Sequence, residues 1–149
     1  MIIFDTNVIS EMMRASLDPR FNAWLQLRRG EAAATTAVNV YEIQFGLHRL
    51  PHGGRRADLE ARFERLVGAP GFVILPMTED AARRAGVMMA IRYAKGQPKG
   101  EADMMIAGIA AEASAAIATR NVRDSRGLDL RSSILGARPR TKRWATRLR

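Results

Sequence analysis

The chain begins with a short apolar run that ends in an acid. Ile2, Ile3 and Phe4 are β-branched or aromatic and favour a buried strand, which Asp5 then closes. Thr6 and Asn7 begin a segment whose pattern predicts a helix. Ligands of α/β proteins bind just beyond the carboxyl ends of parallel strands. Asp5 is expected at such a point, and we expect further carboxylates to gather around it and hold a divalent cation.

The same order of a short apolar strand followed by a helix recurs along the chain. Asp18 with Pro19, and later Thr78, have the residue types that begin helices. Apolar spacing predicts helices over residues 19–28, 38–50, 58–67, 79–93 and 101–113, and strands over 33–36, 72–75 and 115–119, of which 72–75 is expected to be buried. This alternation indicates an α/β fold with a mostly parallel central sheet of four to five strands flanked by helices on both faces.

Composition limits the classes of site that the chain can carry. The 149 residues fit one domain, and the absence of cysteine excludes disulfides and thiolate metal sites. His48 and His52 are too few for a His-rich zinc site. No apolar run is long enough to span a membrane and no signal peptide is visible, so we expect a cytoplasmic protein.

The positive charge is concentrated at the C-terminus. Of the net charge of +9, residues 131–149 carry +7, from six Arg and one Lys, so residues 1–130 carry only +2. We therefore expect a domain over residues 1–130 and a basic tail of uncertain structure over residues 131–149. Basic chains favour anionic partners such as nucleic acid.

Three further acids stand in surroundings that are unusual for surface residues. Glu42 interrupts an apolar helix that we expect to be mostly buried, and a buried Glu needs a partner. Asp103 lies in the first turn of a helix, where backbone N–H groups favour the ionised form. Asp124, with Asn121, follows the strand at 115–119. Each also has an ordinary explanation, as a helix cap, a solvated side chain or a loop residue. Their placement together favours a common site.

Four stretches of this sequence, in this order, resemble the PIN-domain ribonucleases and among them the VapC-type toxins of bacterial toxin–antitoxin pairs. The stretches are IIFDTNVISEMMR, NVYEIQFGLHRL, EADMMIAGIAAE and ATRNVRD. The resemblance covers residues 1–130 and implies a PIN-like three-layer sandwich. It matches Asp5, Glu42 and Asp103 to the first three acids of the family. We choose Asp124 as the fourth, with Asn121 as a helper, and Thr6 and Asn7 match the polar residues that steady the first acid.

The resemblance also implies a mechanism and partners. Hydrolysis of a phosphodiester needs cations, and Mg²⁺ or Mn²⁺ prefer oxygen ligands. We expect Asp5 and Asp103 to be direct metal ligands, with Glu42 and Asp124 completing the catalytic set through water. The implied substrate is RNA, often tRNA or rRNA, and the implied partners are a cognate antitoxin and a second copy of the chain. Candidates for that shared surface, or alternatively for plain core, are Trp24, Leu25, Leu27, Tyr41, Phe45 and Leu47.

Two other functions fit parts of this pattern. A phosphatase of the haloacid dehalogenase type also begins with an apolar strand that ends in Asp, but it needs a second Asp where this chain has Asn7. A basic RNA-binding or antitoxin-binding module with an impaired site is the second alternative. Ser125, in place of a frequent aromatic residue, and the sequence after Leu130 depart from the family pattern.

Overall fold

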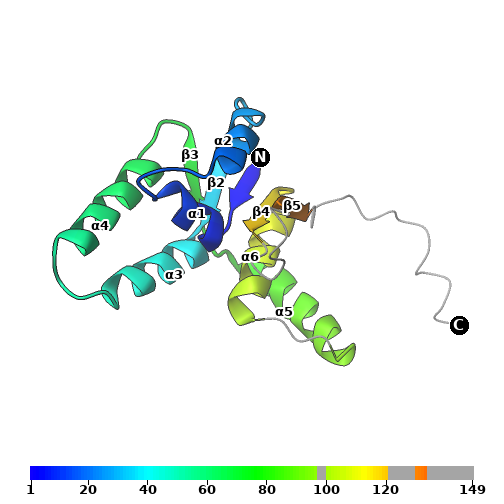
Figure 1. The fold of residues 1–149 in the computed structure, drawn as a ribbon. Helices are drawn as coiled ribbons and strands as arrows, with labels where there is room; N and C mark the ends of the chain where they lie inside the picture. Colours follow the sequence, from blue (N-terminus) through cyan, green and yellow to red (C-terminus); the bar gives the residue numbers. More distant parts are fainter. Residues whose placement is uncertain (97–99, 121–129, 134–149) are drawn as a thin grey trace, which may run out of the picture.

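A computed structural model describes residues 1–96, 100–120 and 130–133 (Figure 1). Its sheet has the strand order β3-β2-β1-β4-β5. Strands β1 (Ile2–Phe4), β2 (Ala33–Thr36), β3 (Phe72–Leu75) and β4 (Ala116–Arg120) are parallel, and β5 (Leu130–Ser133) runs antiparallel to β4. The predicted mostly parallel sheet is therefore confirmed. Strand β5 reaches into the segment that was assigned to the tail, and the domain boundary at residue 130 remains a prediction.

Strand β1 is the centre of this sheet. Ile3 is in register with Ala34 of β2 and with Ile117 of β4. The Asp5 N–H donates to the Ala118 carbonyl at 3.1 Å, so the pairing of β1 with β4 extends one residue beyond the strand. Because β1, β2 and β4 are parallel, their carboxyl ends lie at one edge of the sheet.

Six helices cover the sheet in the described part of the chain. They are α1 (Thr6–Met12), α2 (Pro19–Gln26), α3 (Ala37–His48), α4 (Gly54–Val67), α5 (Glu79–Ala94) and α6 (Glu101–Glu112). The predicted caps are confirmed, since Asp18 accepts hydrogen bonds from the N–H groups of Arg20 and Phe21, and Thr78 accepts from Ala81. Helix α4 begins four residues before the predicted start. Its first turn contains Arg56, whose side chain pairs with Glu60 at 2.7 Å and supports the extra turn.

Alternation along β1 divides the core between the two faces of the sheet. Successive strand residues point to opposite faces, so Ile2 and Phe4 share one cluster and Ile3 belongs to the other. The first cluster is built with α1, α2, α3 and α4, and it contains Val8, Phe21, Ile43, Leu47 and Phe63. The second is built mainly with α5 and α6, and it contains Val38, Ala81, Ile106, Ile109 and Ala110. Figure 1 shows these two groups of helices on either side of the sheet, which confirms the three-layer sandwich.

Two expectations about burial are wrong. Strand β3 was expected to be buried, but Val73 is 42% and Ile74 44% exposed, because β3 is an edge strand with a neighbour on one side only. Helix α3 was expected to be mostly buried, but Tyr41 is 68% and Phe45 56% exposed. The two rings stack on each other with 6.4 Å between centroids. No helix among the described residues has the length and apolar character needed to cross a membrane.

Candidate active site

Asp5 lies at the carboxyl end of β1 and is the N-cap of α1. Its carboxylate accepts a hydrogen bond from the Val8 N–H at 2.8 Å, which is the local reason that the chain turns into a helix here. Burial raises the pKa of Asp5 above its ordinary value, and the charge of Glu42 acts in the same direction. Hydrogen bonds from Thr119, Val8 and Asn7 oppose that rise in pKa. The ionised carboxylate is therefore in an unfavourable place that a nearby cation would improve.

Glu42 is brought to Asp5 by the junction of β2 and α3. Thr36 caps α3 through a capping box with Asn39, and one turn later Glu42 emerges half-buried from the helix. Glu42 Oε2 accepts a hydrogen bond from the hydroxyl of Thr6, the residue after Asp5. Two acids that are 37 positions apart in the sequence thus meet at one edge of the sheet.

The two polar residues after Asp5 have different contacts. The Thr6 hydroxyl donates to Glu42, so its side chain steadies the second acid. Asn7 is exposed, and its backbone N–H bonds to Asp5. The hydroxyl of Thr119, on the neighbouring strand β4, also bonds to Asp5.

Asp103 is an exposed residue in the first turn of α6, as predicted. Its carboxylate lies close to the start of the helix, since a Cβ built at Gly100 would be 3.6 Å from Asp103 Oδ2. Helices α3 and α6 pack on each other, and Val38 and Ile106 share one core cluster. Glu42 and Asp103 are therefore carried by neighbouring helices. Among residues 1–96, 100–120 and 130–133, however, no three Asp, Glu, His or Cys side chains are grouped closely enough to hold a metal ion together.

Asn121 and Asp124, which were predicted to complete the site, lie outside the described residues. Strand β4, after which they follow in the sequence, ends at Arg120 beside β1. Their place in the site remains a prediction.

Sequence reasoning missed four polar residues that support the two acids. They are Thr35, Thr36, Asn39 and Thr119. Thr36 and Asn39 stand three apart at the start of a helix, which is the spacing of a capping box with Asn in place of Glu or Gln. That spacing was the available signal. Thr35 and Thr119 give none, because their contacts depend on the order of the strands.

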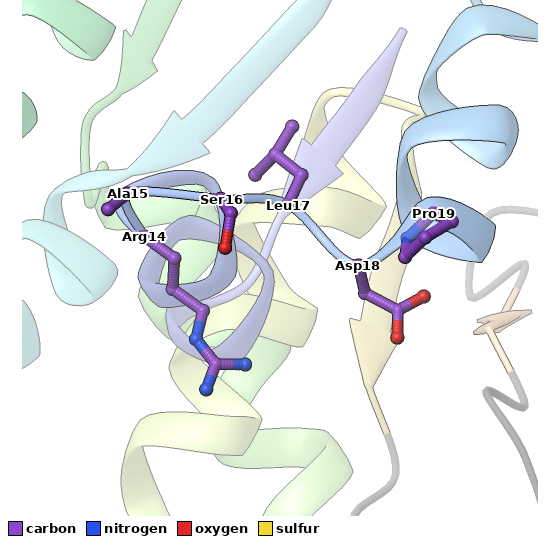
Figure 2. A pocket seen from close by; sticks show the side chains of 6 residues that line it. All are labelled: Arg14, Ala15, Ser16, Leu17, Asp18 and Pro19. Atoms are coloured by element: carbon purple, nitrogen blue, oxygen red, sulfur yellow. The ribbon is translucent and has the colours of Figure 1, made fainter.

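A pocket of about 520 Å³ lies away from these acids, between the end of α1 and the start of α2 (Figure 2). Its polar lining includes Arg14, Ser16 and Asp18. Arg14 also pairs with Glu11 at 3.0 Å, and Asp18 caps α2. Both charged groups have local structural roles, and none of the predicted site residues lines this pocket.

Comparison with known proteins agrees with this fold and site. The model of the PIN domain family matches residues 2–126. The chain is 35% identical over 133 residues to VapC ribonuclease Y4jK of Sinorhizobium fredii, covering 87% of this chain and 95% of that relative. It is 33% identical over 123 residues to toxin FitB of Neisseria gonorrhoeae, covering 81% and 88%. The crystal structure of FitAcB from the same organism superposes with a TM-score of 0.68 over 81% of this chain and 88% of that chain.

The fold and the acids at its carboxyl edge define a PIN-domain protein. The chain belongs to the PIN domain family, and within it to the VapC-type toxins. The predicted family and fold class are therefore confirmed.

Proposed function

We propose that this VapC-type protein is a metal-dependent endoribonuclease, the toxin of a toxin–antitoxin pair, which hydrolyses phosphodiester bonds of tRNA or rRNA in the cytoplasm. Its family supplies the enzyme class, since VapC-type proteins are ribonucleases. The observation that carries the proposal is the meeting of Asp5 and Glu42 through Thr6 at the carboxyl edge of the sheet. Paired carboxylates repel each other unless a cation lies between them, which makes them suited to divalent metal binding.

The available ligands fit Mg²⁺ or Mn²⁺. Both ions prefer carboxylate and water oxygens, and the chain has no cysteine. We assign Asp5 and Asp103 as direct ligands and Glu42 and Asp124 as ligands through water, with Asn121, Thr6 and Asn7 in support. A bound ion would supply activation of water and neutralisation of charge on the phosphate.

The residues of the chain hold the acids ready for this role. The backbone N–H groups at the start of α6 favour the ionised form of Asp103. The Val8 N–H fixes the orientation of Asp5, and the Thr6 hydroxyl fixes that of Glu42. Glu42 is thereby kept as a hydrogen-bond acceptor, which is the state in which a carboxylate can position water.

Mutation of single acids tests the proposal. Asp5→Asn and Asp103→Asn should each abolish cleavage of single-stranded RNA in Mn²⁺, because each loses a charged metal ligand. Asp80→Asn is the matched control, since Asp80 is an exposed acid in the first turn of the neighbouring helix α5 and pairs with Arg84. It should cleave like the wild type. Full activity of Asp103→Asn, or undiminished cleavage in excess EDTA, would contradict the metal-nuclease assignment. Folded protein without cleavage in any metal would favour the impaired binding module.

The proposal includes a cognate antitoxin and a homodimer, as the FitAcB complex suggests for a relative. Of the six apolar residues considered for a shared surface, Leu47 is buried and Trp24 and Leu25 pack on the core. Leu27 is 82% exposed, and Tyr41 and Phe45 form an exposed stacked pair on α3. These three are the remaining candidates. Light scattering at micromolar concentration and co-purification from the native operon test this; a monomer with no small bound protein would contradict it.

A further inference from the structure

Buried polar side chains are concentrated beside the two acids. Within the described residues, the polar or charged side chains that are buried belong to Glu11, Thr35, Thr36 and Asn39. Three of these four lie where β2 ends and α3 begins, with Thr36 and Asn39 at 0% exposure and Thr35 at 1%. Burying polar groups is unfavourable unless their hydrogen bonds are made, so the contacts of this cluster indicate what it holds.

The cluster holds the chain on both sides of Asp5. The Thr35 hydroxyl donates to the carbonyl oxygen of Phe4, the residue before Asp5, at 3.0 Å. The Asn39 side-chain amide donates to the hydroxyl oxygen of Thr6, the residue after Asp5, at 3.1 Å. The position of the Asp5 backbone relative to α3 is thus fixed by two hydrogen bonds from buried residues.

The amide of Asn39 is held in one orientation. Its Oδ1 accepts from the Thr36 hydroxyl at 2.7 Å and from the Thr36 N–H at 3.3 Å. Its Nδ2 therefore faces Thr6. Because the Thr6 oxygen accepts a proton from Asn39, the single hydroxyl proton of Thr6 is left to donate to Glu42, which it does. The bonds run in one direction, from Asn39 through Thr6 to Glu42.

We propose that Asn39 is a positioning residue, which with Thr35 and Thr36 forms a buried polar clamp that sets Glu42 and Asp5 relative to each other. This inference rests on the proposed nuclease function and names a group that acts on the site without touching the substrate. Hydrogen bonds in a dry interior are stronger than at the surface, and connected bonds reinforce one another. Such outer groups typically change metal affinity or activity about 10- to 100-fold when removed.

Four variants of the full-length protein test the clamp. Thr6→Val keeps the shape of the side chain and removes the hydroxyl, whereas Thr6→Ser keeps the hydroxyl. Asn39→Ala removes the amide, and the fourth variant combines Asn39→Ala with Thr6→Val. Asn22→Ala is the control, because Asn22 is an exposed amide on α2 whose side chain bonds only to Gln26 among the contacts described. The measurements are kcat and KM for RNA cleavage, the Kd for Mn²⁺ by calorimetry, and thermal melting.

Thr6→Val and Asn39→Ala should each lower kcat or weaken Mn²⁺ binding about 10- to 100-fold with little change in KM. Thr6→Ser and Asn22→Ala should stay near the wild type. The double variant should be no worse than the more impaired single variant, because both changes break the same series of bonds. Asn39→Ala also removes the capping box, so Thr6→Val decides the result if Asn39→Ala does not fold.

Wild-type kcat and Mn²⁺ affinity in Thr6→Val would overturn the clamp, as would losses that multiply in the double variant. Failure of the nuclease proposal has a different signature, since the wild-type protein would then not cleave RNA in Mn²⁺. In that case the Mn²⁺ affinities alone decide whether the clamp positions the acids.

Discussion

Replacing Gly108 with alanine should force helices α5 and α6 apart. Gly108 lies in the middle of α6, and a Cβ at this position would be 2.3 Å from the backbone oxygen of Ala81. It would also be 3.0 Å from the backbone nitrogen and the Cβ of Ala85. Ordinary contacts begin at 3.4 Å, so the closest pair of atoms is short by about 1 Å. The obstructing atoms belong to a helix backbone and cannot rotate away as a flexible side chain would.

Two opposing effects set the magnitude of this change. Alanine is favoured over glycine inside a helix by about 1 kcal/mol. Overpacking of a dense core costs about 1–3 kcal/mol, and contact with backbone places this site near the upper end. The clash therefore prevails, with a net loss of about 1–2 kcal/mol. For a domain of this size, that corresponds to a fall of about 2–8 °C in the melting temperature.

The assay compares thermal melting of Gly108→Ala with that of Gly86→Ala. Gly86 lies in the facing helix α5, and nothing lies within 4 Å of a Cβ built there. Gly86→Ala should therefore raise the free energy of unfolding by about 0.5–1 kcal/mol. Displacement of α6 also moves Asp103, so RNA cleavage by Gly108→Ala should fall, by up to about 100-fold for a shift of about 1 Å. A melting temperature for Gly108→Ala at or above that of the wild type would refute the reasoning.

Three further predictions concern charge, packing and the tail. Because the folded-state pKa of Asp5 is raised above its ordinary value of 3.8, ionisation of Asp5 destabilises the fold as pH rises from about 3.8 through that raised pKa. In EDTA, Asp5→Asn should gain stability relative to the wild type over that window; a gain that instead grows toward low pH contradicts this. Phe21 is fully buried and stacked on Trp24 at 5.9 Å, so Phe21→Ala should cost about 3–5 kcal/mol in urea unfolding, and a loss below about 1.5 kcal/mol would be inconsistent with that packing. Truncation after Gly136 should leave folding and cleavage in place and flatten the salt dependence of RNA binding by about 0.7 in log–log slope per lost phosphate contact; unfolding, or an unchanged slope, counts against an RNA-binding tail.

The sequence alone determined the features that depend on neighbouring residues. The apolar run at Ile2–Phe4, the caps at Asp18 and Thr78, and the first-turn acid Asp103 were all predictable. Each rests on hydrogen bonds or side-chain spacing within about four residues, so the information lies within one window of the chain. The order of strands and helices followed from the same local signals. Together with the family resemblance, these signals also selected Asp5 and Glu42 as partners.

Only the tertiary structure decided which neighbours each residue has. Strand β3 and the strand β1 have similar apolar sequences, yet β3 is half-exposed because it lies at the edge of the sheet. The apolar circumference of α3 predicted burial, but Tyr41 and Phe45 face outward because the two core clusters take up its other sides. Likewise, Asn39 is an ordinary helix residue in the sequence. It becomes the support of Glu42 because parallel pairing of β1 with β2 places Thr6 within reach of its amide, at a separation of 33 residues.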